Sequence, residues 1–278
     1  MGGFRGLRLM DTHPASSADG ARVVRRAISL LREVSAARGN GATLKMLADS
    51  AGLPQPTAHR LLKVLQAEGL LERDAASRAY RLGSLLYEFG LAAVPRVDAR
   101  RLCAGTLERI TRAVGDTTYL NSRSGNDALC LDRREGSFEI HALPIEIGNR
   151  RPLGVGAGAL AVLASLPSTE ADAVIEANAR RYRRHGLTAE RIRIYVEATR
   201  ARGFAITSGR IVAQYRGVAI AVGNGIGGVP ASLAVVAIAE RLDPRRVEQV
   251  ARILIREEKS LREVLAIAPA GPTESPVP

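Results

Sequence analysis

The chain has 278 residues, of which 46% are hydrophobic, 24% charged and only 4% aromatic. This composition excludes disorder over most of the chain and predicts a core built from Ala, Val, Leu and Ile. No run of 18 apolar residues and no secretory apolar segment occurs, so neither a membrane span nor a signal peptide is expected. Two cysteines, Cys103 and Cys130, are too few for a disulfide framework and suit a reducing cytoplasm.

The net charge of +12 predicts a polyanionic partner, with nucleic acid as the first choice. Arginine outnumbers lysine by 37 to 3, however, and a GC-rich coding bias produces such a skew by itself. The basic excess is also shared by both halves of the chain. Charge therefore permits DNA binding and does not establish it.

The N-terminal part of the chain divides into an arm at 1–19, expected to be disordered, and a patterned region at 20–83. The patterned region carries three stretches of helical periodicity followed by two of strand character. The helices are expected from Val23 to just before Gly39, from the N-cap Thr43 to the turn at Gly52, and at 54–68, and the strands at 70–73 and 79–82. Three helices followed by a hairpin predict a winged helix-turn-helix.

Residues 84–97 are expected to form a linker helix, interrupted at Pro95, before a second domain at 98–268 and a disordered tail at 269–278. Helical and strand patterns alternate through the second domain, which predicts a mixed α/β fold. We expect helices at 98–114 and 156–166, from Ser168, from Thr188 and from Pro244 to 265, and strands at 117–121, 128–132, 138–143, 204–207, 217–223 and 232–238.

The linker helix is more apolar than a linker needs to be in order to cover itself. Its apolar side chains are Leu85, Leu86, Phe89 and Leu91. Because a single winged domain makes few base contacts, two heads related by a two-fold axis are the usual way to read a pseudo-palindromic site. We therefore expect these side chains to join two heads, although packing within one chain is the other interpretation.

The sharpest functional signal is the segment 43–63, a short helix, a glycine turn and a second helix, the arrangement that reads a DNA major groove. Four apolar residues of the second helix are expected to face the core: Ala58, Leu61, Leu62 and Leu65. Five polar residues are left facing outward: Gln55, Thr57, His59, Arg60 and Lys63.

These outward side chains have the chemistry that DNA requires. Gln pairs with adenine and Arg with guanine, whereas Thr and Lys suit phosphate oxygens. Arg78, near the hairpin tip, is placed to reach a minor groove or a phosphate. The alternative is an ordinary three-helix module whose polar face is simply solvated.

An enzymatic interpretation rests on the segment 156–161, which satisfies the G-x-G-x-x-A string that opens dinucleotide sites. Residues 149–153 before it do not form a buried-strand pattern, so a βαβ unit is hard to draw. Walker A, CxxC and HExxH motifs are missing, and the four histidines lack metal-ligand spacing. We expect no catalytic residue, no metal and no cofactor. The alternative is a small-molecule enzyme, with or without dependence on a nucleotide, fused to a structural helical module.

Residues 22–90 resemble the N-terminal domain of IclR-type bacterial transcriptional regulators, through the run 43–65 and the hairpin 68–83. The resemblance continues to about Leu265 through four short motifs: Leu131-Asp132-Arg133, Gly148-Asn149-Arg150-Arg151-Pro152-Leu153, Gly217-Val218 and Arg241-Leu242-Asp243-Pro244. It implies a winged helix-turn-helix head and a GAF-like mixed α/β domain that binds a small organic effector. It also implies a cytoplasmic homodimer or dimer of dimers on double-stranded operator DNA. Of repression and activation, between which the sequence does not choose, repression is the expected output.

The start of the helix at 156–166 offers unpaired backbone N–H groups that suit a carboxylate. The resemblance places Ala157 and Gly158 at these amides and four further residues on the sheet opposite: Thr207, Ile220, Ala234 and Val236. To these we add Gly156 at the helix start and Asn121 as a specificity donor.

Three of the expected sheet residues, Ile220, Ala234 and Val236, are apolar where several relatives carry polar groups. This departure predicts an organic acid with a sizeable apolar or aromatic body. Two other interpretations stay open: the glycine run is only a tightly packed helix start, or the pocket is filled by its own side chains.

Overall fold

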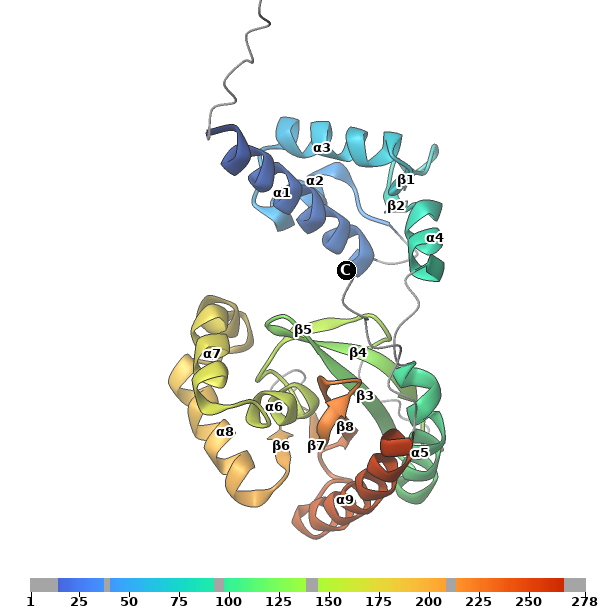
Figure 1. Cartoon of the computed structure of the whole chain (residues 1–278), viewed down its shortest axis with the longest axis vertical. Helices are drawn as coiled ribbons and strands as arrows, with labels where there is room; N and C mark the ends of the chain where they lie inside the picture. The colour runs from blue at the N-terminus through green and yellow to red at the C-terminus, as the bar shows by residue number, and fades with distance from the viewer. Residues whose placement is uncertain (1–14, 38–40, 93–97, 139–144, 209–213, 268–278) are drawn as a thin grey trace, which may run out of the picture. The chain divides into compact units, whose positions relative to one another are not determined.

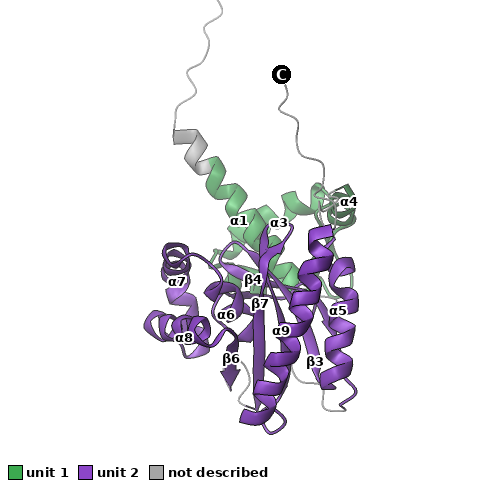
Figure 2. Cartoon of the chain, turned by 60° about the horizontal axis from the view of Figure 1, so that its bottom comes forward, with its two compact units in different colours: residues 1–94 green, residues 95–278 purple. Residues whose placement is uncertain are grey.

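The computed structural model describes residues 15–37, 41–92, 98–138, 145–208 and 214–267 (Figure 1). The chain divides into two compact units, residues 1–94 and 95–278, which we call the head and the C-terminal domain (Figure 2). The predicted tail at 269–278 and the first part of the predicted arm lie outside the described residues. Among the described helices, none combines the length and the hydropathy that crossing a bilayer requires.

In its described residues, the head consists of four helices and a two-stranded hairpin. Its elements are α1 (Ala15–Ala37), α2 (Leu44–Ala51), α3 (Gln55–Ala67), β1 (Leu71–Arg73), β2 (Tyr80–Leu82) and α4 (Ser84–Ala92). The first helix begins at Ala15, so the last five residues of the predicted arm are helical instead. The prediction started this helix at the apolar repeat, and the preceding turns carry no apolar stripe to mark them.

The turn between α2 and α3 is held by local backbone chemistry. Thr43 caps α2, its Oγ1 accepting from the Met46 N–H at 3.4 Å. Gly52 closes the helix in the left-handed region at φ 63°, and the Leu53 N–H donates to the Ala48 carbonyl at 2.9 Å. Glycine adopts this conformation without the Cβ penalty. The turn therefore orients α3 firmly against α2.

One apolar cluster holds the head together. Its buried members are Leu30, Val34, Ala42, Leu47, Ala48, Ala58, Leu62, Leu65, Leu71 and Tyr80. They come from α1, α2, α3, both hairpin strands and Ala42, which bridges to Tyr80 before α2, so the wing is packed onto the helices. At the base of the hairpin a Cβ on Gly83 would lie 2.1 Å from the Gly69 carbonyl oxygen, which requires glycine there. Leu61, expected in this core, is only partly buried.

The described residues of the C-terminal domain form a six-stranded antiparallel sheet of order β5-β4-β3-β8-β7-β6. The strands are β3 (Thr117–Ser124), β4 (Asp127–Arg134), β5 (Arg150–Pro152), β6 (Ala205–Ser208), β7 (Tyr215–Ile226) and β8 (Val229–Ile238). The helices are α5 (Ala99–Val114), α6 (Ala157–Ala164), α7 (Ser168–Tyr182), α8 (Ala189–Arg202) and α9 (Pro244–Ile267), with a 3-10 turn at Arg183–His185.

Helices cover both faces of this sheet, as Figure 1 shows. Helices α6, α7 and α8 lie on one face and share a core with the sheet side chains Tyr119, Ala219 and Ala234. Helices α5 and α9 lie on the other face, where Leu120 and Leu233 point. Neighbouring strand residues thus enter different cores, as the two-residue period of a strand requires.

The strands of the C-terminal domain differ from the sequence prediction at residues 149–153. Residues 149–153 were not expected to form a strand, yet Arg150–Pro152 pairs with β4 at the edge of the sheet. Two arginines and a proline give no β pattern, and an edge position tolerates all three. The strand expected at 138–143 lies almost wholly outside the described residues.

Candidate functional site

The outward face of α3 carries the polar side chains that the sequence singled out. Gln55, Arg60 and Lys63 are exposed, and Thr57 and His59 are half-buried at the flanks. At 100° per residue, Arg60 and Lys63 fall near the centre of the exposed face. The helix contains no acidic residue. A helix face with two free cations and no carboxylate suits a polyanion.

The start of α3 is also open to an anion. Its N-cap, Pro54, makes no side-chain capping hydrogen bond, and Pro56 occupies the first turn. The remaining first-turn amides of a helix are donors that a phosphate oxygen accepts from readily. The geometry thus adds backbone donors to the side chains of this face.

Arg78 projects from a rigid turn at the hairpin tip. Its φ of 57° is unusual for a residue other than glycine. The Asp74 carboxylate holds the turn by accepting from the Ser77 N–H and hydroxyl, both at 2.7 Å. The backbone hydrogen bond from Ser77 is the main reason that the pKa of Asp74 lies below its ordinary value. Arg78 is therefore an exposed cation on a well-defined tip.

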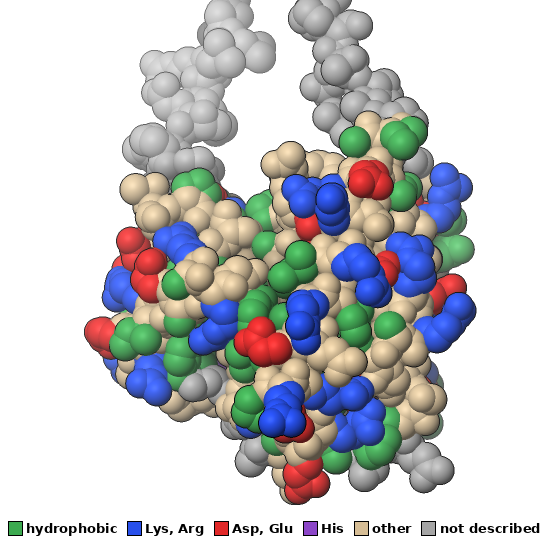
Figure 3. Space-filling view, turned by 90° about the horizontal axis from the view of Figure 1, so that it is seen from below, with side chains coloured by type: hydrophobic (Ala, Val, Ile, Leu, Met, Phe, Trp, Pro, Cys, Tyr) green, Lys and Arg blue, Asp and Glu red, His purple; other side chains and the backbone are tan. Residues whose placement is uncertain are grey.

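The net positive charge of the chain does not make its whole surface uniformly basic. On the face shown in Figure 3, Lys and Arg side chains alternate with Asp and Glu and with apolar patches. Two acidic side chains of α9 form ion pairs, Glu257 with Arg109 of α5 at 2.7 Å and Glu258 with Arg262 at 2.9 Å. The position of a binding site must therefore come from local geometry, since net charge does not supply it.

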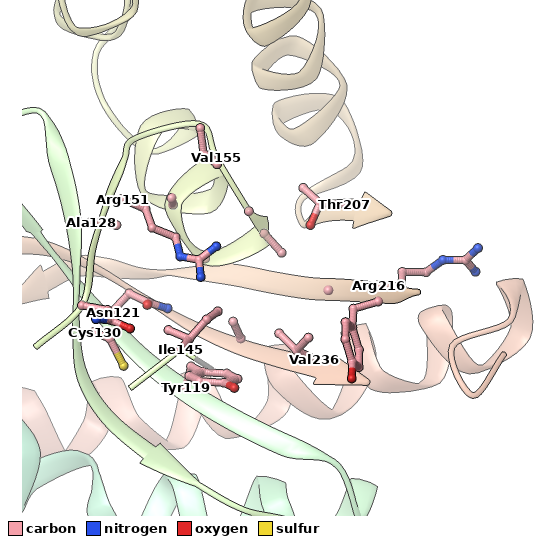
Figure 4. Close-up of a pocket in the computed structure, with 18 residues that line it drawn as sticks. Tyr119, Asn121, Ala128, Cys130, Ile145, Arg151, Val155, Thr207, Arg216 and Val236 are labelled. Carbon is pink, nitrogen blue, oxygen red and sulfur yellow. The ribbon is translucent and has the colours of Figure 1, made fainter. Parts of the chain in front are cut away.

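A pocket opens between α6 and the sheet in the C-terminal domain (Figure 4). It contains about 630 Å³ of empty space, counting the solvent at its mouth. Its described lining residues are Tyr119, Asn121, Ala128, Cys130, Ile145, Asn149, Arg151, Val155, Gly156, Ala157, Gly158, Ala159, Thr207, Tyr215, Arg216, Gly217, Ala234 and Val236. The wall is mostly apolar with a few polar groups, the usual make-up of a small-molecule site.

The α6 side of the pocket is a helix start without a side-chain cap. Gly156 takes φ 89° as the N-cap, and no side chain bonds to the first-turn amides of the helix. Gly158 lies tightly against the sheet, since a Cβ there would lie 2.3 Å from Asn121 Nδ2. Asn121 donates to the Ser232 hydroxyl at 3.4 Å, which in turn donates to the Gly158 carbonyl at 3.0 Å. Asn121 thus serves the packing of α6 besides lining the pocket.

The structure brings seven of the eight expected pocket residues together, and the placement of Ile220 is wrong. The seven are Asn121, Gly156, Ala157, Gly158, Thr207, Ala234 and Val236. Ile220 is 4% exposed in the core between the sheet and the helices α5 and α9. On β7, Gly217 lines the pocket and Ala219 lies in the core on the same face of the sheet, so the side chain of Ile220 points to the opposite face.

Sequence reasoning missed the most polar part of the pocket wall. Arg151 extends from β5 into the pocket, as Figure 4 shows. Tyr119 forms another part of the wall, and burial raises its pKa to about 12. Cys130 was interpreted as a core residue, and it is both buried and part of the lining. Adjacent strand residues face opposite ways, so one of Arg150 and Arg151 had to face the pocket, but only the sheet register shows that it is Arg151.

A metal site finds no support in the ranges that the structure covers. No group of three or more His, Cys, Asp and Glu residues within them is arranged to hold a metal ion. The pocket wall described above contains no carboxylate, and its nitrogen donors are amides and guanidinium groups. Such a donor set favours an organic anion over a cation.

Two protein-family models match the chain and establish the family to which it belongs. A family model described as the bacterial transcriptional regulator IclR C-terminal domain matches residues 91–261, which is more than half of the chain. A second model, the IclR helix-turn-helix domain, matches residues 23–75. The chain belongs to the IclR family of bacterial transcriptional regulators. It is a transcriptional regulator with a helix-turn-helix DNA-binding domain and an IclR C-terminal domain.

IclR-family relatives agree with this assignment. The chain is 37% identical over 134 residues to the HTH-type transcriptional regulator KipR of Bacillus subtilis, covering 48% of this chain and 53% of KipR. The chain thus spans about half the length of that relative. It is 30% identical over 198 residues to the regulator XynR of Escherichia coli, covering 69% of this chain and 77% of XynR.

Solved IclR-family structures show the same fold. A regulator from Brucella abortus superposes with a TM-score of 0.71 at 20% identity, covering 94% of this chain and 96% of that one. An IclR homologue from Microbacterium hydrocarbonoxydans, solved in complex with 4-hydroxybenzoate, gives a TM-score of 0.67 at 24% identity. That match covers 88% of this chain and all of the other.

Proposed function

We propose that this regulator binds operator DNA through α3 and the hairpin tip, and that a small organic acid in the C-terminal pocket changes its operator affinity. The observation that carries this proposal is the pocket itself, with its uncapped helix start, inward guanidinium and apolar wall. A structural neighbour crystallised with 4-hydroxybenzoate supports an organic acid. We propose that the regulator is a cytoplasmic repressor and that it has no enzymatic activity.

The coupling between ligand and DNA is a matter of differential affinity. A ligand shifts an equilibrium between two arrangements only by the difference in its binding free energy for each. If the arrangement that fits the operator holds the acid less well, the acid lowers operator affinity. A repressor then leaves its site when the acid accumulates.

Arg60 and Lys63 are predicted to contribute to operator binding in different ways. A bidentate contact from Arg60 to a base is worth about 1–3 kcal/mol and selects sequence, whereas Lys63 meets phosphate. Arg60→Ala should therefore weaken binding and relax specificity, and Lys63→Ala should lower the salt slope by about one. Gel-shift titrations over a salt series measure both effects.

A matched control for these variants is Arg112→Ala, which removes one exposed cation from α5 in the other domain. Its operator affinity should equal that of the wild type. Wild-type affinity in Arg60→Ala and Lys63→Ala as well would rule out the assigned face of α3.

The effector proposal predicts that an aromatic acid stabilises the protein and releases it from DNA. Thermal shift and operator release are measured with 4-hydroxybenzoate, benzoate and glyoxylate, and the two aromatic acids should act at lower concentration. Burial of a ring contributes about 25 cal/mol per Å² of apolar area, which glyoxylate lacks. Stabilisation by glyoxylate alone would contradict the proposed apolar selectivity.

A pocket-blocking variant tests where the acid binds. Gly158→Val is unsuitable, since its side chain would displace Asn121 from the α6 contact. Ala234→Leu instead adds volume on the pocket side of β8, and Ile220→Val removes a methyl group on the opposite face of the sheet. We expect the first variant to lose the response to 4-hydroxybenzoate and the second to keep it. Equal responses would place the site elsewhere.

We further propose that the regulator acts as a homodimer or a dimer of dimers. Helix α4 has no buried residue, and Tyr87, Phe89 and Leu91 are 70%, 54% and 62% exposed. In a pair of heads related by a two-fold axis, a second copy of α4 would cover these exposed apolar side chains. Leu85 and Leu86, the other apolar residues of this helix that the sequence singled out, are half-buried.

A further inference from the structure

The guanidinium of Arg151 occupies an unusual electrostatic position. Arg151 is half-buried on β5, and it extends into the pocket in Figure 4. Loss of solvent is the main reason that its pKa lies below the ordinary value for arginine. Its electrostatic neighbours are the phenol of Tyr119 and the thiol of Cys130, and neither is a carboxylate. Within the described residues no carboxylate pairs with Arg151, and a partly desolvated cation without a compensating anion raises the free energy of the ligand-free state.

Neighbouring arginines of the same region do not share this situation. Arg150, the preceding residue, turns outward to bond with Asp127 Oδ2 at 3.3 Å and the Ser124 hydroxyl at 2.9 Å. Arg216 also lines the pocket, but its side chain points away in Figure 4 and donates to the Leu242 carbonyl. Among the described lining residues, Arg151 is thus the cation that faces the cavity, and none of the others is acidic.

The surroundings of Arg151 define the rest of a ligand. Ile145, Val155 and Ala128 lie on the lining near it, and Ala234 and Val236 line the sheet side. These side chains offer apolar contact area and no competing negative charge. A ligand that carries an anionic group on an apolar body therefore complements this wall.

We infer that Arg151 is the anion receptor of the pocket and determines its selectivity for the ionised form of an apolar or aromatic monocarboxylic acid. This inference rests on the proposed function and names the group that selects the acid. The planar guanidinium fork matches the two oxygens of a carboxylate, which adds geometric to electrostatic selectivity. It also replaces the expected placement of the carboxylate at the amides of Ala157 and Gly158.

The test compares a charged with an uncharged ligand on two proteins. Titration calorimetry measures 4-hydroxybenzoate and 4-hydroxybenzamide on the wild type and on Arg151→Leu. The wild type should prefer the acid, and Arg151→Leu should bind the acid about 10- to 100-fold more weakly while its affinity for the amide changes little. Arg151→Lys, which keeps the charge without the fork, should fall between the two.

Two matched controls are available. Arg150→Gln and Arg216→Gln each remove a cation whose side chain bonds elsewhere, and both should keep the wild-type preference for the acid. A second readout needs no ligand: the unfolding midpoint of ligand-free Arg151→Leu should equal or exceed that of the wild type. A lower midpoint would mean that Arg151 serves the fold, which contradicts the inference.

The outcomes separate this inference from the proposed function. If 4-hydroxybenzoate binds the wild type and Arg151→Leu equally, the acid is held by the α6 amides, and only the inference fails. If neither 4-hydroxybenzoate, benzoate nor glyoxylate binds the wild type, the proposed function fails and the inference fails with it. Loss of acid affinity in Arg151→Leu with retained amide affinity supports both.

Discussion

Replacement of Asp116 by alanine is expected to lower the free energy of unfolding of the C-terminal domain by about 3 kcal/mol. Asp116 is 3% exposed and accepts from Arg241 Nε at 2.8 Å and from an Arg246 NH2 group at 3.1 Å. Without the carboxylate, two partly buried cations lose their partner. The same Arg246 group also donates to the Val114 carbonyl at 2.6 Å, so the end of α5 loosens with it.

Urea unfolding followed by circular dichroism measures this change, with Asp172→Ala as the matched control. Asp172 pairs with Arg193 at 3.1 Å, but its side chain is 58% exposed. Exposed ion pairs contribute at most about 1 kcal/mol, so the control should lie within that range. A loss in Asp116→Ala no larger than in the control would show that solvent compensates the two arginines.

This cluster also explains one of the motifs behind the family resemblance. In Arg241-Leu242-Asp243-Pro244, the arginine binds Asp116 and lies 4.0 Å over the ring of Phe138. Leu242 is fully buried, and Asp243 caps α9 by accepting from the Arg246 N–H at 2.8 Å. The motif thus fastens the start of α9 to the start of β3. Its residues act on the fold and do not touch the pocket.

Local signals in the sequence predicted the head well. Thr43 and Gly52 mark the two ends of α2 by chemistry that needs no tertiary contact. The apolar spacing of Ala58, Leu62 and Leu65 determines which face of α3 is buried, and hence which side chains are outward. Where the periodic pattern is long and the ends are capped, the sequence suffices.

The pocket residues that the sequence predicted wrongly or missed lie on strands, where alternate residues face opposite sides of the sheet. The resemblance placed Ile220 in the pocket, yet Gly217 and Ala219 pair with the pocket residues Val236 and Ala234 and share their face of the sheet, so Ile220 faces the other core. Arg151 was overlooked because β5 is a three-residue edge strand without a β pattern. Both positions require the sheet register, which periodicity alone does not provide.

Charged substitutions on α4 are expected to separate the two subunits of the proposed dimer. In Phe89→Glu and Leu91→Glu, a carboxylate replaces an exposed apolar side chain, and a dimer contact through this helix would bury it without a partner. The head should still fold, because no α4 side chain is buried within it. A surface position of another helix, Ile194→Glu in α8 at 57% exposure, serves as the matched control.

Loss of the dimer should affect DNA binding more than any single α3 contact. Two linked heads gain about 10²–10⁴-fold over one because the second half-site is bound intramolecularly. Operator affinity in Phe89→Glu and Leu91→Glu should fall by a factor in that range, while affinity for a single half-site stays unchanged. Light scattering at micromolar protein then reports a smaller species than the wild type and Ile194→Glu give. Dimers of wild-type stability in both α4 variants would show that the subunits meet through another surface. A monomeric wild type on operator DNA would exclude the dimer itself.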